Sequence, residues 1–532
     1  MIQERVKQAL AEYADAVLRL GRSGEKPIFA DGIYVESGKP VIWRFTDGRE
    51  VPVANLTNQQ NMFRALCALS RLSGEERYEK ALKEALSYYF EHLQDAGGLL
   101  YMGGHHFVNF ETGEHQGIPE KGEVHELKDC FPFYELMFEV DKEAAKRYIE
   151  GFWNAHVYHW DKLEISRHGQ YGLVLDNVWE HEYSKPEPFF ETSGLSFLNA
   201  GNDLIYSAGM LAAMTEKEAP LIWAKRLAQQ YVDARHPATG VGGYQFSRPR
   251  KTQDTSDDNE TRSFFGDRAS RQLGPEFGEI ALEGNLLLPN QANCMCYHNV
   301  LMQLHLAELL GEQGECFAKQ TLDGYEAYIT HAYHWEDNTF RPMWSDGTDL
   351  SGFALKRNGY YGKAGKTFEP SRAGVNFFFS ALRAYRYAGK EIFWDMARNI
   401  AKHNGLGDIG VRPGEAAAPA LNTDNASPLV LLGVRELYLL GREAVYGKLA
   451  DRIAENILGA RTDCFWGGKR NGIVRFDQLE PYALAAYLDM YMEGESRIPV
   501  FMHSSGYIHG DFRKEDGTVC MMKNGDNFYT YL

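Results

Sequence analysis

The chain has 532 residues, of which 44% are hydrophobic and 24% charged, a balance typical of a globular protein with a sizeable core. Its formal net charge of −17 repels phosphates, which excludes nucleic acids and acidic membrane surfaces as natural partners. No segment has the roughly 18 to 20 uninterrupted apolar residues of a membrane span. The amino terminus lacks the apolar stretch of a signal peptide, and the seven cysteines are an odd number. We therefore expect a cytoplasmic protein without an obligate protein partner.

Hydrophobic periodicity predicts a mostly helical chain. Apolar residues recur every three or four positions over residues 1–20, which indicates an opening helix. Short β-rich pieces at 33–35 and 41–43 then predict a small hairpin. The tail from Pro499 to Leu532 has little helical period and predicts a second β-rich extension. Further helical windows lie at 57–72, 76–93, 131–158, 203–215, 217–235, 291–311, 315–334, 371–388, 391–404, 428–441, 443–459 and 477–492.

The links between these windows alternate in length. Short turns such as Ala388-Gly389-Lys390 alternate with long, glycine-rich segments. This alternation predicts an all-α fold, an α/α toroid whose short links lie on one face and whose long loops lie on the other. Because helical hairpins can extend one ring-shaped unit, we expect a single catalytic domain over residues 1–532, with β-rich insertions near 27–53 and 499–532.

Three of the long links carry candidate metal ligands. His105 follows two glycines, Glu126 closes a second glycine-rich stretch, and His168 stands directly after Arg167. Two histidines and one carboxylate suit a first-row divalent metal and leave coordination positions open. Spacing alone does not show that the three meet. In isolation, each histidine is more often a hydrogen-bonded structural residue than a ligand.

The order of these residues resembles that of a known family. Glu126 follows His105 by 21 positions, and Arg167 and His168 follow Glu126 by 41 and 42. This constellation resembles the metal and base residues of the pectate lyases of polysaccharide lyase family 2. The likeness extends to the run Arg167-His168-Gly169-Gln170-Tyr171-Gly172 and to Phe265–Gly278.

That resemblance implies a fold, a reaction and a set of site residues. The fold is an (α/α)7 barrel with β-rich arms around a cleft. The metal ligands are His105, Glu126 and His168, and the Brønsted base is Arg167. The reaction is β-elimination in polygalacturonate, in which the C5 proton is removed and the C4 glycosidic oxygen departs. Without a signal peptide, we expect imported oligogalacturonides as the substrate.

The chemistry explains why a metal would be needed. An ionised carboxylate makes the neighbouring C5 proton harder to remove, and a divalent cation on that carboxylate stabilises the developing charge. Two imidazoles and one carboxylate suit Mn²⁺, or Ni²⁺ or Co²⁺, better than Ca²⁺, which prefers oxygen ligands.

The role of the arginines stays open at this point. A guanidinium group is normally protonated, so Arg167 can act as a base only beside a cation and away from water. Alternatively, Arg167 stays charged and binds a substrate carboxylate while a water is the base. Arg268, Arg271 and Lys356-Arg357 are further candidates for binding substrate carboxylates, with a surface salt bridge as the alternative for each.

Other functions also remain to be separated. Sugar epimerases and glycoside hydrolases use α/α barrels too, the first with histidine acid and base, the second with two carboxylates. A carbohydrate-binding protein without catalysis is a third class. Only a lyase would release a product whose conjugated double bond absorbs ultraviolet light.

Overall fold

A computed structural model describes residues 2–45, 47–118, 124–185, 196–247, 267–466, 472–506, 511–513 and 519–521. The chain divides into two compact units. Unit 1 comprises Met1–Phe152, Gly169–Asp176 and Asn404–Leu532, and unit 2 comprises Trp153–His168 and Asn177–His403. The expectation that all 532 residues act as one catalytic domain stays a prediction.

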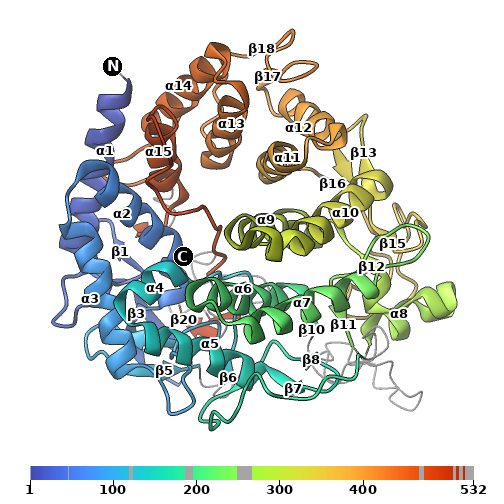
Figure 1. Ribbon diagram of the computed structural model, residues 1–532, viewed down its shortest axis with the longest axis horizontal. Helices are drawn as coiled ribbons and strands as arrows, with labels where there is room; N and C mark the ends of the chain where they lie inside the picture. Colours follow the sequence, from blue (N-terminus) through green and yellow to red (C-terminus); the bar gives the residue numbers. More distant parts are fainter. Residues whose placement is uncertain are drawn as a thin grey trace. The chain divides into compact units, whose positions relative to one another are not determined.

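Unit 1 brings the two ends of the chain together. Helix α15 packs against α2 on one side and α13 on the other, and α1 packs against α15 and α14. Helix α3 packs against α2, and α14 packs against α13. Figure 1 shows these helices in blue and in orange to red. The helices that lie wholly or mostly in unit 1 are α1 (Ile2–Ala16), α2 (Gln60–Ser73), α3 (Arg77–His92), α4 (Tyr134–Val140), α5 (Lys142–His156), α13 (Pro428–Gly441), α14 (Ala444–Gly459) and α15 (Leu479–Asp489).

Unit 2 is built from antiparallel helix pairs in two layers. Helices α6, α9 and α11 pack against one another in that order, and each is paired with the helix that follows it, α7, α10 or α12 (Figure 1). Residues 198–212 of α6 and 299–307 of α9 are all buried, polar side chains such as Asn202, Asp203 and Gln303 included, so both helices are enclosed on every side. The bounds are α6 (Leu198–Thr215), α7 (Glu218–Asp233), α8 (Arg268–Phe277), α9 (Asn299–Leu310), α10 (Glu315–Ala332), α11 (Val375–Ala388) and α12 (Glu391–His403).

The strands are short and mostly form two-stranded pairs. The larger exception is a six-stranded antiparallel sheet in unit 1, of order β21-β20-β2-β3-β4-β5. Its strands are β2 (Ile42–Phe45), β3 (Glu50–Ala54), β4 (His106–Asn109), β5 (His115–Gly117), β20 (Asp511–Arg513) and β21 (Val519–Met521). The sheet buries Trp43, Phe45 and Phe107, whose rings stack. The two β-rich regions expected near 27–53 and 499–532 therefore contribute to one sheet, while 507–510, 514–518 and 522–532 lie outside the described residues.

The hairpin expected from 33–35 and 41–43 is present as a short antiparallel turn. Ile33 bridges Pro40, the Tyr34 N–H donates to the Lys39 carbonyl at 2.9 Å, and the Val41 N–H donates to the Gly32 carbonyl at 3.0 Å. Strand β1 (Gly32–Tyr34) pairs with β19 (Ile473–Arg475), whereas β2 pairs with β3 and β20. A Cβ atom on Gly32 would lie 2.4 Å from the Val474 carbonyl oxygen, so this close approach requires glycine. Because β19, the second partner of β1, is more than 400 positions away, local turn signals could not reveal this pairing.

The remaining strands occur in loops between the helices. They are β6 (Val124–His125) with β9 (Gly169–Gln170), β7 (Val157–His159) with β8 (Glu164–Ile165), β10 (Ser196–Phe197) with β11 (Gln245–Phe246), β12 (Leu286–Leu287) with β15 (Met343–Trp344), β13 (Tyr333–His334) and β16 (Ser371–Arg372) with β14 (Thr339–Phe340), and β17 (Gly407–Asp408) with β18 (Ala418–Pro419). The expected fold class, an all-α fold of the (α/α)-barrel type with small β-rich additions, is confirmed.

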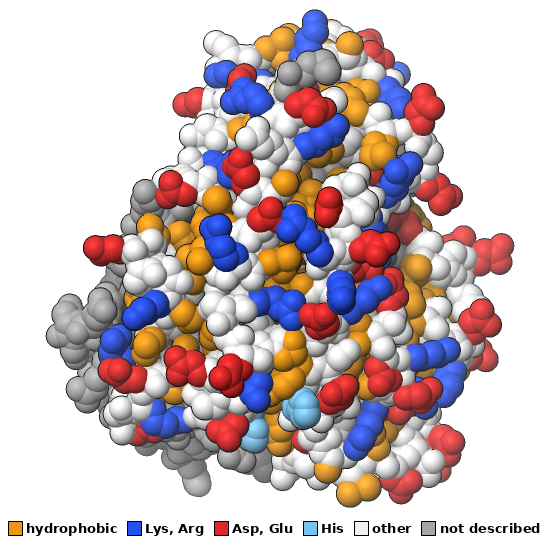
Figure 2. Space-filling view, turned by 90° about the vertical axis from the view of Figure 1, so that its left-hand side faces the viewer, with side chains coloured by type: hydrophobic (Ala, Val, Ile, Leu, Met, Phe, Trp, Pro, Cys, Tyr) orange, Lys and Arg blue, Asp and Glu red, His pale blue; other side chains and the backbone are white. Residues whose placement is uncertain are grey.

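The surface shows no area dominated by one sign of charge on the face drawn in Figure 2, where Lys and Arg are interspersed with Asp and Glu. Among the described helices, none combines the length and the apolar composition that crossing a membrane requires.

Candidate metal centre

The short strands β6 and β9 bring Glu126 and His168 together. The strands are antiparallel, with Val124 opposite Gln170 and His125 opposite Gly169. One further step in this register places Glu126 opposite His168. Directly opposite residues of an antiparallel pair have Cβ atoms about 4.5–5.5 Å apart and extend toward the same face. The two candidate ligands are therefore neighbours because of strand pairing, although 42 positions separate them in the sequence.

A glycine bridge adds His105 to this pair. Gly103 forms a parallel bridge with Glu126, and the Gly104 N–H donates to the Glu126 carbonyl oxygen at 3.0 Å. Gly103 has a φ of +115°, and a Cβ atom there would lie 2.4 Å from the same carbonyl oxygen. Only glycine satisfies both conditions. His105 follows two residues after the bridge, so the glycines fix its distance from Glu126.

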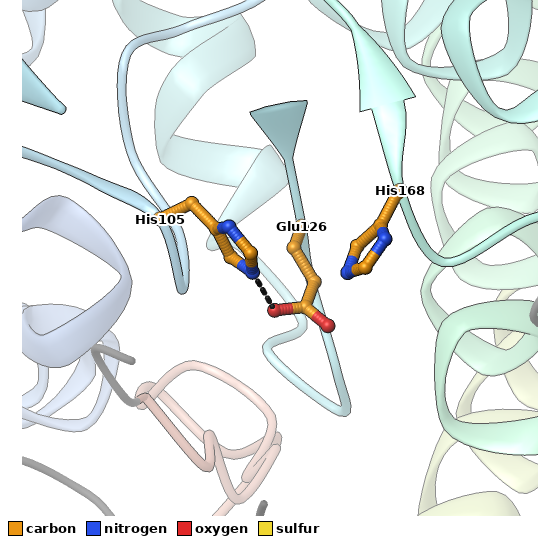
Figure 3. Close-up of side chains that lie close together, drawn as sticks. All are labelled: His105, Glu126 and His168. Carbon is orange, nitrogen blue, oxygen red and sulfur yellow. Dashed lines mark ion pairs between the residues drawn. The ribbon is translucent and has the colours of Figure 1, made fainter. Parts of the chain in front are cut away.

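The side chains of the three residues converge (Figure 3). One ligand atom from each of His105, Glu126 and His168 lies within 4.8 Å of the other two. His105 Nε2 is 2.9 Å from one oxygen of Glu126, and Lys128 Nζ is 2.9 Å from the other. His105 and Glu126 are buried, with 5% and 0% of their surfaces exposed. The structure thus brings together all three predicted ligands.

This donor set fits a divalent metal ion. Two imidazole nitrogens and one carboxylate oxygen, gathered from three separate segments, form a combination that first-row divalent cations accept. Neutral imidazoles add no charge, so the set leaves a divalent cation net positive and able to attract a carboxylate. His105, Glu126 and His168 would be the residues that hold it.

The neighbouring histidines have a different environment. His125 lies on the opposite face of β6, where its ring packs against Tyr148, Phe152 and Tyr171. His106 is 1% exposed and contacts the Tyr171 ring edge to face at 4.7 Å. Burial, with the nearby His115, lowers the pKa of His106 to about 4, so its imidazole is neutral near pH 7. These two histidines therefore serve as aromatic packing residues.

Arg167 lies in a loop held by hydrogen bonds on both sides. The His168 N–H donates to Ser166 Oγ at 3.1 Å, and the Tyr158 hydroxyl donates to the His168 carbonyl at 3.0 Å. The Arg167 guanidinium carbon lies 4.7 Å from the centroid of the Phe197 ring, a cation–π distance. These contacts fix the backbone and hold the guanidinium against an apolar surface, although Arg167 remains partly exposed.

Lys128 is the residue at this site that the sequence reasoning missed. Its ammonium group pairs with Glu126, and only 13% of its side chain is exposed. Lys128 lies in a bend that follows the bridge at Glu126, so no periodicity in the sequence indicated that its ammonium group reaches this carboxylate.

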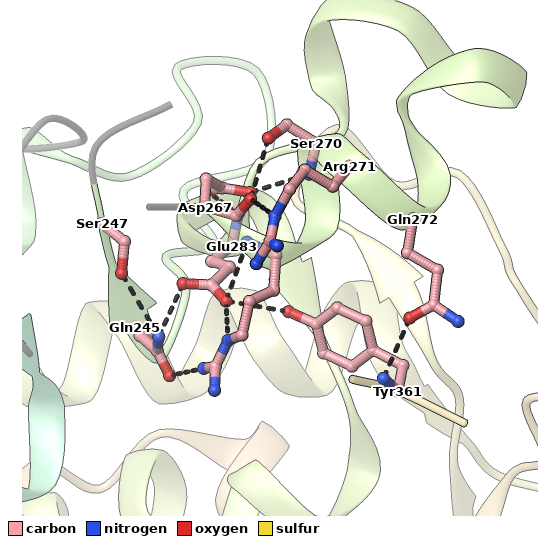
Figure 4. Close-up of polar contacts among 9 residues, drawn as sticks. Gln245, Ser247, Asp267, Ser270, Arg271, Gln272, Glu283 and Tyr361 are labelled. Carbon is pink, nitrogen blue, oxygen red and sulfur yellow. Dashed lines mark hydrogen bonds and ion pairs between the residues drawn. The ribbon is translucent and has the colours of Figure 1, made fainter. Parts of the chain in front are cut away.

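Arg268 and Arg271 belong to a separate polar cluster, drawn in Figure 4. Arg268 is 4% exposed, forms an ion pair with Glu283 and donates to the side chain of Gln245. Burial alone would lower the pKa of Arg268, but the Glu283 carboxylate raises it. Arg271 Nε donates to the Asp267 carbonyl oxygen at 3.2 Å. The expected surface salt bridge is thus a buried one for Arg268, and a role for either arginine in substrate binding stays a prediction.

Comparison with known proteins places the chain among polysaccharide-degrading enzymes. Residues 26–511 match the model of a family described as periplasmic pectate lyase. The chain is also 34% identical over 520 residues to a pectate disaccharide-lyase of Dickeya dadantii (strain 3937), which covers 95% of this chain and 92% of the relative.

Solved structures of sugar-active enzymes also align with the chain at low sequence identity. An α-1,2-mannosidase from Trichoderma reesei aligns with a TM-score of 0.50 at 10% identity, covering 98% of this chain and 99% of that chain. A sugar epimerase from a ruminal bacterium aligns with a TM-score of 0.43 at 14% identity, covering 77% of this chain and 88% of that chain. At these identities the mannosidase likeness shows the fold alone.

Proposed function

The chain belongs to the pectate lyase family whose model matches residues 26–511, and from this premise we propose that it cleaves pectate by metal-assisted β-elimination between C4 and C5. The observation that carries the proposal is the convergence of His105, Glu126 and His168, whose ligand atoms lie within 4.8 Å of one another. We further propose Mn²⁺ as the preferred metal, with Ni²⁺ or Co²⁺ as substitutes, because imidazole nitrogens suit these ions better than Ca²⁺.

We assign metal binding and proton transfer to different residues of the chain. A divalent metal, when bound, supplies positive charge next to the substrate carboxylate and so stabilises the charge that develops as the C5 proton leaves. His105, Glu126 and His168 hold that metal, and Lys128 stabilises the Glu126 carboxylate through its ion pair.

Arg167 would be the base that accepts the C5 proton. It directly precedes the ligand His168, and its guanidinium lies against the Phe197 ring, so an apolar surface shields one side of it from water. A nearby cation and the loss of hydration both disfavour the protonated guanidinium. The proton passes from C5 to an Arg167 nitrogen, and the C5–H electron pair forms the C4–C5 double bond. The C4–O bond breaks, its electron pair leaves with the glycosidic oxygen, and that oxygen takes a proton from water.

The family relative narrows the proposed substrate. The Dickeya protein is named a pectate disaccharide-lyase, and the match covers 95% of the present chain. We propose oligogalacturonides as the substrate and release of an unsaturated disaccharide as the product. A time course of digestion, resolved by product size, would show disaccharide from the first minutes if this is right.

The compartment is a separate proposal. The odd number of seven cysteines favours a reducing compartment, and we propose the cytoplasm. The family is described as periplasmic, which favours the other side of the inner membrane. Fractionation of the cells that produce the protein, with lyase activity measured in each fraction, would decide between the two.

One experiment tests the central proposal. Purified protein is treated with a chelator, and formation of unsaturated product from polygalacturonate is followed by ultraviolet absorption. Activity should be lost and should return with Mn²⁺, while far-ultraviolet circular dichroism stays unchanged because the helical core needs no metal. Full activity after verified metal removal would contradict the proposed mechanism. A hydrolase or epimerase would give no absorbing product at any metal concentration.

A further inference from the structure

A buried asparagine grips the loop that carries the metal ligands. Asn55 is fully buried at the end of β3. Its Nδ2 donates to the Gly103 carbonyl oxygen at 2.9 Å, and its Oδ1 accepts from the Gly103 N–H at 3.2 Å. The carboxamide thus binds both backbone polar groups of one residue. Among side chains, only Asn and Gln offer a neutral donor and acceptor on adjacent atoms in this way.

Gly103 is the residue through which both nearby ligands are placed. It bridges to Glu126, and it precedes His105 by two positions. Its φ of +115° is a conformation that glycine adopts readily but that nothing in its own side chain enforces. An external restraint on this backbone would therefore limit the motion of His105 relative to Glu126.

Asn55 is itself held in place from behind. Asp31, 2% exposed, accepts the Asn55 N–H at 2.7 Å and also side-chain N–H groups of Asn58 and Gln59, both at 2.8 Å. These bonds tie the start of the turn after β3 to the segment before β1. Asn58 resembles Asn55 in type and burial and binds the same carboxylate, but its side-chain amide donates to Asp31 Oδ2 at 2.8 Å rather than to Gly103.

We infer that Asn55 is a positioning residue of the metal centre: by holding Gly103 it sets the separation of His105 from Glu126 and thereby the affinity for the metal. The inference rests on the proposed function, since it concerns the same site. Second-layer residues that orient metal ligands typically change metal affinity about 10- to 100-fold when they are replaced. Asn55 would act in this way through a backbone segment, without contacting a ligand side chain.

The alternative is a purely structural role, in which Asn55 only caps a helical turn. Its Oδ1 also accepts from Thr57 N–H at 3.4 Å and from Thr57 Oγ1 at 3.0 Å, at the start of the 3₁₀ turn Leu56–Gln59. Serine is as good as asparagine at an N-cap position, but its shorter side chain has no amide to place on Gly103. Asn55→Ser therefore separates the two roles.

The test compares Asn55→Ser with Asn58→Ser in the full-length chain. Mn²⁺ affinity is measured by calorimetry, and the visible spectrum of the Co²⁺-loaded protein reports ligand geometry. We expect Asn55→Ser to weaken Mn²⁺ binding about 10- to 100-fold and to change the Co²⁺ spectrum. Asn58→Ser should leave both unchanged, even where its melting temperature falls as much. Lyase activity of Asn55→Ser should recover at high Mn²⁺ concentration, which a general folding defect would not allow.

Asn55→Asp is the second variant and decides the matter if the serine variant does not fold. Aspartate keeps the cap and the shape but replaces the donor to the Gly103 carbonyl by an acceptor, so the same loss of affinity is expected. Wild-type affinity for Mn²⁺ in the Asn55 variants would overturn this inference but would leave the proposed metal mechanism standing. Equal losses in the Asn55 and Asn58 variants, in step with their melting temperatures, would also overturn it. A wild-type chain that binds no Mn²⁺ would overturn the proposed metal mechanism as well.

Discussion

Two buried clusters of charged side chains, one around Glu126 and one around Glu283, balance their charge in different ways. Glu283 accepts from the backbone and side chain of Arg268 and from Gln245 at 2.6 Å, so a guanidinium inside the cluster matches its charge. Asp267 also belongs to this network, accepting from the Glu283 and Ser270 N–H groups at 2.7 Å. This arrangement is what a buried ion pair requires for stability.

More groups surround the Glu126 carboxylate than are needed to balance its charge. Lys128 already supplies a positive partner for the carboxylate, and two imidazoles converge there as well. A buried carboxylate that is already paired with lysine does not need two imidazoles to balance its charge. A divalent cation, by contrast, needs several ligand atoms around it. The comparison teaches that burial of charge is a poor guide to function, and that an excess of ligand groups beyond internal pairing is a better one.

The largest effect should come from the site itself. Arg167→Lys should lower kcat about 10²- to 10⁴-fold, because lysine moves the nitrogen away from the C5 proton and loses the planar guanidinium. Mn²⁺ affinity should be kept, since the three proposed ligands are unchanged, and KM should change less than kcat. Steady-state formation of unsaturated product and metal content are the measurements.

A matched control for this change is Arg226→Lys. Arg226 also lies over aromatic rings, those of Tyr183 and Trp223, at 4.6 and 4.5 Å. Its replacement should leave kcat unchanged. Near-normal turnover with a raised KM in Arg167→Lys would instead show that Arg167 binds a substrate carboxylate, and a water would then be the base.

The Glu283 cluster should show the opposite behaviour, a loss of stability without a loss of metal. Arg268→Met leaves Glu283 buried without its cation, which should cost about 3–5 kcal/mol. Adding Glu283→Leu should recover much of this loss, because a pair of apolar residues no longer leaves an unpaired charge. Urea midpoints and Mn²⁺ affinity of the single and double variants are the measurements. A raised KM with an unchanged urea midpoint would favour the substrate-binding role instead.

The sequence predicted helices well where apolar periodicity was strong. The windows 217–235 and 428–441 match α7 and α13 almost residue for residue. The window 131–158 did not predict the break at Asp141, whose φ of −153° is extended and separates α4 from α5. Helix α8 was missed because it is short and contains Pro275, which local rules place outside helices.

The site was predicted only in part from its residues. The ligand types were visible, but their assignment depended on resemblance, because the β6–β9 register that joins Glu126 to His168 is only two residue pairs long. No periodicity can reveal such a short strand. Asn55 and Lys128 were missed for a related reason, since their contacts with Gly103 and Glu126 depend on tertiary structure.

A third buried carboxylate, Asp31, extends the comparison to a group that forms no ion pair with any of the described residues. Burial raises the pKa of Asp31 to about 7, although hydrogen bonds from Asn58, Asn55 and Gln59 oppose the shift. A carboxyl group whose pKa is higher in the folded state takes up a proton on folding, so its contribution to stability falls as pH rises from about 4 to about 7. Asp31→Asn should flatten that slope by up to about 1.4 kcal/mol per pH unit.

Urea midpoints across this pH window, for the wild type and the variant, measure the difference in slope. Asp47→Asn is the control. Burial opposes the shift there, but hydrogen bonds from Arg49 lower the pKa of Asp47, so this change should not flatten the slope. Parallel pH profiles for wild type and Asp31→Asn would mean that Asp31 stays ionised over this range.

The smallest effect should come from an ion pair of the same chemistry at the surface. Arg357 binds both oxygens of Glu276 at 2.7 Å, with 37% of the arginine side chain and 22% of the glutamate side chain exposed. Because water solvates both partners after the pair is broken, Arg357→Ala should cost about 1 kcal/mol or less, well below the loss in Arg268→Met. Glu276→Gln should give a similarly small shift in the urea midpoint. KM for polygalacturonate should stay at the wild-type value in both variants, because the guanidinium is already used by Glu276. A raised KM in Arg357→Ala alone would mean that this arginine leaves its glutamate to bind the substrate, and the contrast between buried and surface pairs would then reflect function as well as solvation.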